Sequence, residues 1–273
     1  MKILNKIIIL IFGLFLFACE EVIVVDLDTA PPRLVIEASI DWQKNTTGNE
    51  QKIIISTTTD YYNNEFPKVS GASVSITNTT GTVFDFTEIS NSGEYVCNNF
   101  VPVIGETYAL TILLNGETYS ATETLIATPT IEDTIEQNNT GGFGGDEVEI
   151  TYYYQDDAMQ ENYYFFGMQD SNIAFPQYSV EDDENSQGSL IPVSYSSEDL
   201  KKDDIVSFKL YGISRRYFEY LKKLLVASGN DDGPFQSTPT LVRGNIVNQT
   251  NSNNFTFGYF KLSEVDVQEY TIQ

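Results

Sequence analysis

Carboxylates are the most abundant chemically active side chains in this sequence. The 273 residues contain 39 Asp and Glu, 15 Lys and Arg, and no histidine. Ser-His-Asp and Cys-His catalysis and the usual catalytic zinc sites all rely on imidazole, so these mechanisms are excluded. Glycoside hydrolysis needs only two facing carboxylates, which keeps a carboxylate-dependent glycan hydrolase among the alternatives. An abundance of acids is no evidence for such a pair, and we expect a protein that is not an enzyme.

Three groups of neighbouring acids are the candidate metal ligands. They are residues 181–184 (EDDE), Asp203 with Asp204, and Asp231 with Asp232 in GNDDGPF. Calcium takes oxygen ligands, but none of these runs has the spacing of an EF-hand loop. We therefore expect solvated turns and no cofactor, with calcium as the alternative.

Tyrosine runs and one internal cysteine are the other groups that could act on a ligand. Residues 152–154 and 163–164 are tyrosines that could line a groove for a sugar or peptide. Aromatic residues alternating along strands are more often ordinary sheet packing, which we favour. Cys97 lies in a strand-like segment without a histidine partner and is expected to be a small buried hydrophobe.

The amino terminus has the layout of a secretory signal. Lys2 and Lys6 form a short basic front. Residues 3–17 are almost wholly apolar, and the small residue Ala18 precedes Cys19. The run is shorter than the roughly 20 residues of a comfortable membrane span. The segment LFAC at residues 16–19 resembles the lipobox of bacterial lipoproteins, which implies cleavage before Cys19 and acylation of its thiol. The alternative is an ordinary signal peptide or an uncleaved anchor.

Two glutamates follow the predicted lipid attachment site. Acyl chains such as palmitate hold a protein on a membrane because each buried methylene contributes ~0.8 kcal/mol. Glu20 and Glu21 resemble the surface-export signal of Bacteroidota lipoproteins and so favour the outer face of the outer membrane, with periplasm-facing attachment as the alternative. Removal of residues 1–18 leaves 13 basic and 39 acidic residues, a net charge of −26. This charge repels nucleic acid, so we expect no nucleic-acid partner.

Residues 19–32 are expected to be a lipidated tether, and residues 33–128 have the pattern of an all-β domain. The candidate strands are rich in β-branched and aromatic residues and are separated by turns. They are RLVIEASI, KIIISTTT, ASVSITN, TVFDFTEI, GEYVCNNF, TYALTILL and ETYSATETL. Seven short strands in about a hundred residues predict an immunoglobulin-like β-sandwich. Asn115-Gly116 between the last two predicts a type I′ hairpin turn.

Residues 129–273 predict a second β-rich domain with one packed α-helix. The polar, glycine-rich residues 136–147 predict a flexible linker. VEITYYYQDD and ENYYFFGMQD predict two strands paired around a DDAMQE turn, and IVSFKLYGI predicts another strand. Residues 214–228 have apolar side chains at helical spacing, with Ser214 as the expected N-cap and Gly229 as the stop. The remaining residues return to strand patterns.

The order of several segments carries a family resemblance. These segments are PPRLVIEASI, GETYALTILLNGETYSA, ENYYFF, ISRRYFEYLKKL, GPFQSTPTLVRGNI and FGYFKLSEV. Together with the lipobox cysteine they resemble an uncharacterised family of Bacteroidota surface lipoproteins, domain of unknown function 4249. The resemblance implies an accessory partner of a TonB-dependent outer-membrane receptor. It supplies no catalytic residue, and only Cys19 maps onto a functional position.

We therefore expect a lipid-anchored protein of the cell surface that binds a ligand or supports a transporter without catalysis. The first alternative is a structural or adhesive surface protein. The glycan hydrolase comes last, because nothing in the sequence marks two particular acids as a catalytic pair.

Overall fold

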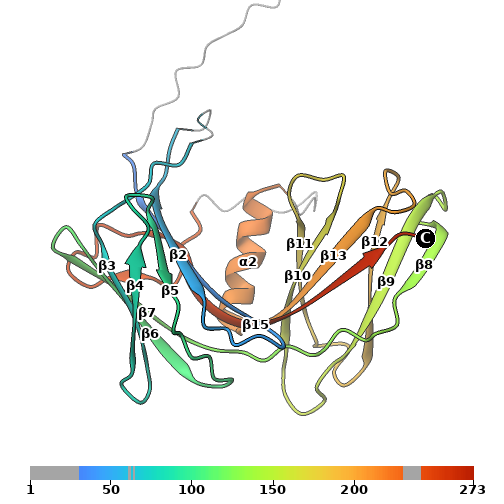
Figure 1. Ribbon diagram of the computed structural model, residues 1–273, viewed down its shortest axis with the longest axis horizontal. Helices are drawn as coiled ribbons and strands as arrows, with labels where there is room; N and C mark the ends of the chain where they lie inside the picture. The colour runs from blue at the N-terminus through green and yellow to red at the C-terminus, as the bar shows by residue number, and fades with distance from the viewer. Residues whose placement is uncertain (1–30, 61–62, 64, 230–240) are drawn as a thin grey trace, which may run out of the picture. The chain divides into compact units, whose positions relative to one another are not determined.

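The structure is a computed structural model that describes residues 31–60, 63, 65–229 and 241–273. The predictions at Cys19, Glu20 and Glu21, and those at Asp231 and Asp232, lie outside these residues. Pro32–Gln273 form one compact unit. The unit is mainly β with one helix among the described residues, as predicted (Figure 1). No helix in the described part of the chain is both long and apolar enough to cross a bilayer.

The first half of the unit contains all seven predicted strands. They are β1 (Leu34–Gln43), β2 (Gln51–Thr57), β3 (Ser73–Asn78), β4 (Val83–Glu88), β5 (Glu94–Cys97), β6 (Thr107–Leu114) and β7 (Glu117–Thr124). Their hydrogen-bonded order is β1-β2-β5-β4-β3-β6-β7. Lettered A to G along the chain, this is the ABED and CFG arrangement of an immunoglobulin constant-type sandwich, with β4 pairing on both sides.

Two local features of this half follow directly from the sequence. Asn115 and Gly116 have φ angles of 52° and 81°, as the predicted type I′ turn between β6 and β7 requires. Tyr108, near the start of β6, donates its hydroxyl to the Val101 carbonyl at 2.9 Å and accepts from the Val103 amide at 3.0 Å. This is the tyrosine corner of immunoglobulin-like sandwiches, and it fixes the loop that enters β6.

The second half contains further strands in two sheets. They are β8 (Glu136–Gly141), β9 (Glu147–Gln155), β10 (Tyr163–Asp170), β11 (Gln177–Asp182), β12 (Leu190–Ser197), β13 (Ile205–Gly212), β14 (Val247–Asn248) and β15 (Phe257–Thr271). Strands β12, β9 and β8 form a three-stranded sheet, while β11, β10, β13 and β15 continue the large sheet of the first half. Strand β14 pairs with β7 at the other end of that sheet.

Two sequence predictions for this half are wrong, and two of its strands were not predicted. Residues 136–141 of the expected linker form edge strand β8, because pairing with β9 supplies its backbone hydrogen bonds without apolar side chains. Strands β9 and β10 do not pair with each other; they face one another across a core, with the Tyr154 and Tyr164 ring centroids 4.9 Å apart. Strand β11 (QYSVED) was not predicted because its sequence is largely polar, and β12 (LIPVSYSS) was not predicted because it contains a proline and ends in polar residues.

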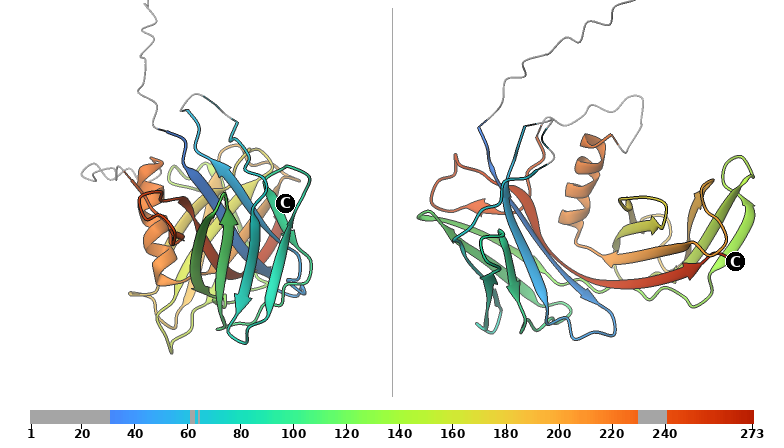
Figure 2. Two further views of the ribbon diagram at one scale, coloured as in Figure 1. Left: turned by 90° about the vertical axis from the view of Figure 1, so that its left-hand side faces the viewer. Right: turned by 45° about the horizontal axis from the view of Figure 1, so that its top comes forward.

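Strand β15 connects the cores of the two halves. It pairs in parallel with β1 through Val265, then antiparallel with β13 from Val265 onward. Phe260 and Leu262 belong to the first-half core, whereas Tyr270 packs against the second-half core. The strand runs continuously between the two sets of strands in Figures 1 and 2. Strand β15 thus belongs to the sheets of both halves. The predicted domain limits, residues 33–128 and 129–273, remain predictions.

Helix α2 (Arg215–Ala227) agrees with the helix predicted at residues 214–228. Ser214 is its N-cap, and the side-chain oxygen accepts from the Tyr217 amide at 3.2 Å. Gly229 ends the helix with a φ of 81°, in the left-handed region that favours glycine. The buried face, which includes Phe218 and Leu221, packs on aromatic and aliphatic residues of β10, β11, β13 and β15.

Candidate functional site

The acid run at residues 181–184 lies partly in a strand and partly in the turn that follows it. Its first two residues end β11, and Asp183 is buried and accepts from the Asn162 amide at 2.8 Å. Asp204 accepts from the Lys201 amide in the turn before β13. In the part of the chain that the structure describes, no three Asp, Glu or Cys side chains are grouped to hold a metal ion. The buried residue of the run, Asp183, therefore serves as a hydrogen-bond acceptor for the backbone.

Three of the five tyrosines in the two runs build the second-half core, whereas Tyr153 and Tyr163 are half-buried and Tyr163 lines a pocket beside α2. Tyr152, Tyr154 and Tyr164 are buried, which confirms the sheet-packing interpretation. The Tyr164 hydroxyl donates to the buried Asp156 carboxylate, and Tyr195 donates to the buried Asp170. Burial raises the pKa of the Tyr164 and Tyr195 hydroxyls, and the acceptor carboxylates raise it further. These acids therefore act as hydrogen-bond acceptors within the core.

Cys97 is free and buried in β5, as predicted for a small hydrophobe. Its thiol contacts the Asn99 side-chain oxygen at 3.1 Å. The residue is an internal part of the first-half core.

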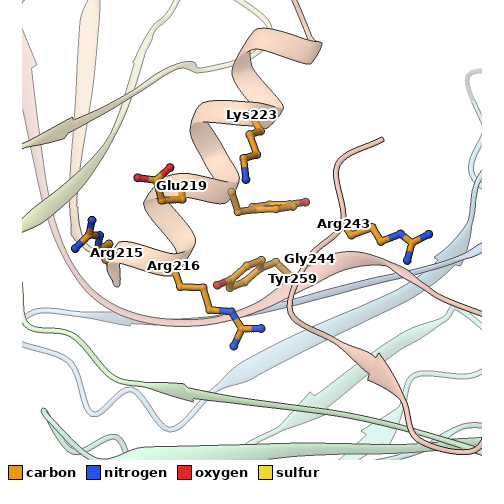
Figure 3. Close-up of a pocket in the computed structure, with 8 residues that line it drawn as sticks. Arg215, Arg216, Glu219, Lys223, Arg243, Gly244 and Tyr259 are labelled. Atoms are coloured by element: carbon orange, nitrogen blue, oxygen red, sulfur yellow. The ribbon is translucent and has the colours of Figure 1, made fainter. Parts of the chain in front are cut away.

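A pocket of about 510 Å³ beside α2 gathers basic side chains. We call it the basic pocket, and it is lined by Arg215, Arg216, Glu219, Tyr220, Lys223, Arg243, Gly244 and Tyr259 (Figure 3). Four basic residues and one acid line it, although the whole chain has 15 basic and 39 acidic residues. The pocket therefore reverses the charge balance of the protein locally.

Helical spacing positions one wall of the basic pocket. Arg216, Tyr220 and Lys223 follow one another at intervals of four and three residues, so they share one face of α2. Arg215 and Glu219, four residues apart, occupy a neighbouring face. Figure 3 shows Arg216 and Lys223 on the side of α2 toward Tyr259, with Arg215 and Glu219 directed away from it. The helix thus presents its cations beside the tyrosine.

A segment fastened to β15 forms the opposite wall. Asn245 is buried, donates to the Phe260 carbonyl at 2.7 Å and accepts from the Phe260 amide at 2.8 Å. A Cβ atom on Gly244 would lie 1.6 Å from the Gly258 carbonyl oxygen, so only glycine allows this close approach. These contacts hold Arg243 at the rim of the pocket.

Arg243 is held by stacking on an aromatic ring. Its guanidinium carbon lies 3.8 Å from the Phe255 ring centroid, and that of Arg33 lies at the same distance. Two guanidinium groups cannot occupy one place, so they lie on opposite faces of the ring. Stacking through the flat face leaves the N–H groups at the edge of Arg243 available for hydrogen bonds.

Two tyrosine rings line the basic pocket with the cations, and a half-buried acid contacts one of them. The Tyr220 and Tyr259 ring centroids are 4.8 Å apart. The Tyr259 hydroxyl contacts the Glu123 carboxylate at 3.3 Å. Burial raises the pKa of the Glu123 carboxyl, an effect that hydrogen bonds and the charge of Arg216 partly offset. Burial also raises the pKa of Tyr259 above its ordinary value.

The cations of the basic pocket have no ion-pair partner within 4.0 Å among the described residues, whose ion pairs are Lys44–Glu264, Lys52–Glu94 and Lys261–Asp41. Guanidinium and ammonium groups only donate hydrogen bonds. An arrangement of several such groups around a pocket can therefore bind an anionic group of a ligand.

Sequence reasoning missed this site. The Arg216, Tyr220 and Lys223 spacing could have indicated its helical wall, but no sequence pattern connects that wall with Arg243 or Tyr259.

Comparison with solved structures finds distant likenesses only. A cytokine receptor complex has a TM-score of 0.26 and 10% identity over 67% of this chain and 85% of that chain. Two fibronectin type III domains of chicken tenascin give 0.22 and 8%, over 66% and 90%. A DUF4785 family protein of Legionella pneumophila gives 0.24 and 13%, over 68% and 54%. TM-scores this low carry no argument about fold or function.

Comparison with protein families identifies the chain where the solved structures do not. No curated protein matches it. The domain of unknown function DUF4249 matches residues 20–269, nearly the whole sequence after the predicted signal peptide. The match agrees with the family resemblance of the sequence segments. The chain therefore belongs to the DUF4249 family.

Proposed function

We propose that this protein is a lipid-anchored, surface-exposed binding module of the outer membrane that acts without catalysis as an accessory partner of a TonB-dependent transporter. The observation that carries the binding role is the basic pocket, which four cations without described ion-pair partners line together with two tyrosines. The LFAC segment at residues 16–19 and the two following glutamates support the anchor and its location. The family resemblance supports the transporter partner.

In this proposal the anchor and the binding site have separate roles. Acylated Cys19 keeps the protein at the membrane, and the residues up to Pro32 act as a tether. When extended, residues 20–31 would span roughly 40 Å at about 3.4 Å per residue. The compact unit can then capture a ligand near the membrane and present it to the transporter, which supplies the transport step.

Two measurements test this proposal. Metabolic labelling with a palmitate analogue is expected to label the wild type and Cys97→Ser, but not Cys19→Ala. Cys97→Ser is the matched control because it removes the other cysteine of the chain. Label retained in Cys19→Ala would contradict the anchor.

The partner is tested by affinity capture of the native lipoprotein from gently solubilised outer membranes, followed by mass spectrometry. We expect a TonB-dependent receptor in stoichiometric amount. Recovery of the lipoprotein without a receptor would contradict the accessory role. Altered cell adhesion with unchanged nutrient uptake in a deletion strain would instead support the adhesive alternative.

A further inference from the structure

We propose that the basic pocket is a binding site for a phosphate-bearing ligand, with Arg216 and Lys223 as the binding residues. Arg243 supplies a further positive charge at the rim, where Figure 3 shows its guanidinium directed away from α2, and Tyr220 and Tyr259 complete the lining. This inference rests on the proposed binding function and names its ligand class. Both walls of the pocket belong to the described residues, and each wall is fixed independently by α2 or by β15.

The charge of the pocket favours a phosphate over a singly charged group. Four cationic side chains and one carboxylate line it. A phosphate monoester carries ≈ −1.5 to −2 charges at pH 7 and three strong acceptor oxygens, so it can engage several donors at once. Arginine presents its donors as a planar fork that matches phosphate geometry, and lysine adds a point charge.

The remainder of the molecule makes this pocket selective for small anions. The chain has a formal net charge of −24, so its long-range field repels anionic polymers. A pocket of about 510 Å³ is large enough for a phosphorylated small molecule or a lipid headgroup. Binding must therefore depend on short-range contacts with the gathered cations.

The geometry also reduces the cost of ordering the binding residues. Arg243 is stacked on Phe255 at 3.8 Å before any ligand binds. Arg216 and Lys223 extend from a helix whose opposite face is buried. Groups that are held in place before binding lose less conformational entropy on binding. Glu219 is the unfavourable element of the lining, because its carboxylate repels a phosphate.

The binding test uses the native lipoprotein reconstituted in phosphatidylcholine vesicles and titrated with pyrophosphate by isothermal titration calorimetry. We expect saturable binding that weakens about tenfold or more in each of Arg216→Ala and Lys223→Ala, and to a smaller extent in Arg243→Ala. Glu219→Gln is expected to bind more tightly, and succinate is expected to bind more weakly than pyrophosphate. Absence of binding at millimolar pyrophosphate, or equal binding of succinate, would overturn the proposal.

Control variants separate a specific site from general charge. Lys201→Ala with Lys202→Ala removes two exposed basic residues outside the pocket and is expected to leave affinity unchanged. An equal loss in this control would overturn the proposal. Arg216→Lys retains the charge but not the fork and is expected to lose only part of the affinity. Circular dichroism melting checks that each variant remains folded, which is expected because the substituted side chains are exposed.

The source of the phosphate is decided by changing the vesicles. If a lipid headgroup occupies the pocket, phosphatidic acid in the vesicles will weaken pyrophosphate binding more than oleic acid at matched surface charge. Equal effects of the two lipids assign the pocket to soluble phosphorylated ligands. If the receptor is captured but pyrophosphate does not bind, the ligand class is wrong while the accessory function stands.

Discussion

The first half of the compact unit (residues 32–128) and the second half (residues 129–273) both form β-structures, but their cores are built differently. The first core is rich in isoleucine, and its tyrosines Tyr95 and Tyr108 donate to backbone carbonyls. The second core is rich in Tyr and Phe, and two of its tyrosines donate to buried carboxylates. An aliphatic sandwich needs shape complementarity alone, whereas the aromatic core also needs buried acceptors in the right places.

The basic pocket forms where the two halves are joined. The first half follows a strand order that many sandwiches share, so its sequence pattern is easily recognised. In the second half, β15 continues beyond the first core, pairs with β13 and packs against α2. The basic pocket lies at this passage, because α2 and the Arg243 segment both contact β15 there.

The largest expected effect comes from breaking the second core. Phe208 is fully buried and its ring centroid lies 4.8 Å from that of Tyr152. Phe208→Ala is expected to lower the free energy of unfolding by about 3–5 kcal/mol. The single tryptophan, Trp42, lies in β1 of the first half and reports on that half by fluorescence. Because β15 joins the cores, we expect the urea midpoint from Trp42 fluorescence to shift together with that from circular dichroism.

An unchanged Trp42 midpoint would show that the halves unfold independently. The matched control is Ile53→Ala in the first core, where Ile53 is fully buried. It is expected to cost about 2–5 kcal/mol and to shift both signals as well.

Alkaline pH is expected to act mainly through the second half. Burial raises the pKa of Tyr152 and Tyr211 above the ordinary value near 10, and it raises that of Tyr108 in the first half to about 12. Above pH ~10 the unfolded chain loses tyrosine protons that the folded chain keeps, so stability falls as pH rises and is unaffected below that range. Each fully buried tyrosine contributes about 1.4 kcal/mol per pH unit.

Tyr152→Phe sharpens this prediction. Its hydroxyl is buried and has no hydrogen-bond partner among the described residues. The variant is expected to show a shallower loss of stability above pH ~10, with no loss at neutral pH. Urea denaturation from neutral to alkaline pH checks this, and an unchanged alkaline slope would contradict it.

A paired tyrosine substitution compares the polar contacts of the two cores. Tyr195→Phe removes the donor to the buried Asp170 carboxylate and is expected to cost about 1.5–3 kcal/mol. Tyr108→Phe removes hydrogen bonds to two neutral backbone groups, the Val101 carbonyl and the Val103 amide, and each is expected to cost about 0.5–1.5 kcal/mol. Urea denaturation at pH 7 measures both, and a larger loss for Tyr108→Phe would reverse the comparison.

The smallest expected effect is at the cap of α2. Ser214→Ala removes the acceptor for the Tyr217 amide and is expected to cost about 1 kcal/mol. Ser214→Thr retains the hydroxyl acceptor at the same position and is expected to be nearly neutral. Equal losses in thermal melting for both variants would show that the cap contact is not what stabilises this helix.

The success of prediction from sequence differed between local and distant contacts. The first-half strands, the Asn115-Gly116 turn and α2 with Ser214 and Gly229 were all predicted, because each depends on neighbouring residues. The pairing of β9 with β10 was predicted wrongly, and β8, β11 and β12 were missed. Strands β8 and β11 pair with the strand next to them in the sequence, whereas β12 pairs with β9 about forty residues earlier. All three are edge strands with few or irregularly spaced apolar residues, which gives little periodic signal.

The sequence alone determined the composition, the exclusion of histidine-based catalysis, the lipobox pattern at Cys19 as a prediction, and the seven strands of the first half. These depend on residue type and local spacing, which a sequence displays directly. The tertiary structure decided the course of β15 and the meeting of Arg216, Lys223 and Arg243 at one pocket. Such contacts follow from β-strand register and the placement of α2, which are set by packing across the whole unit.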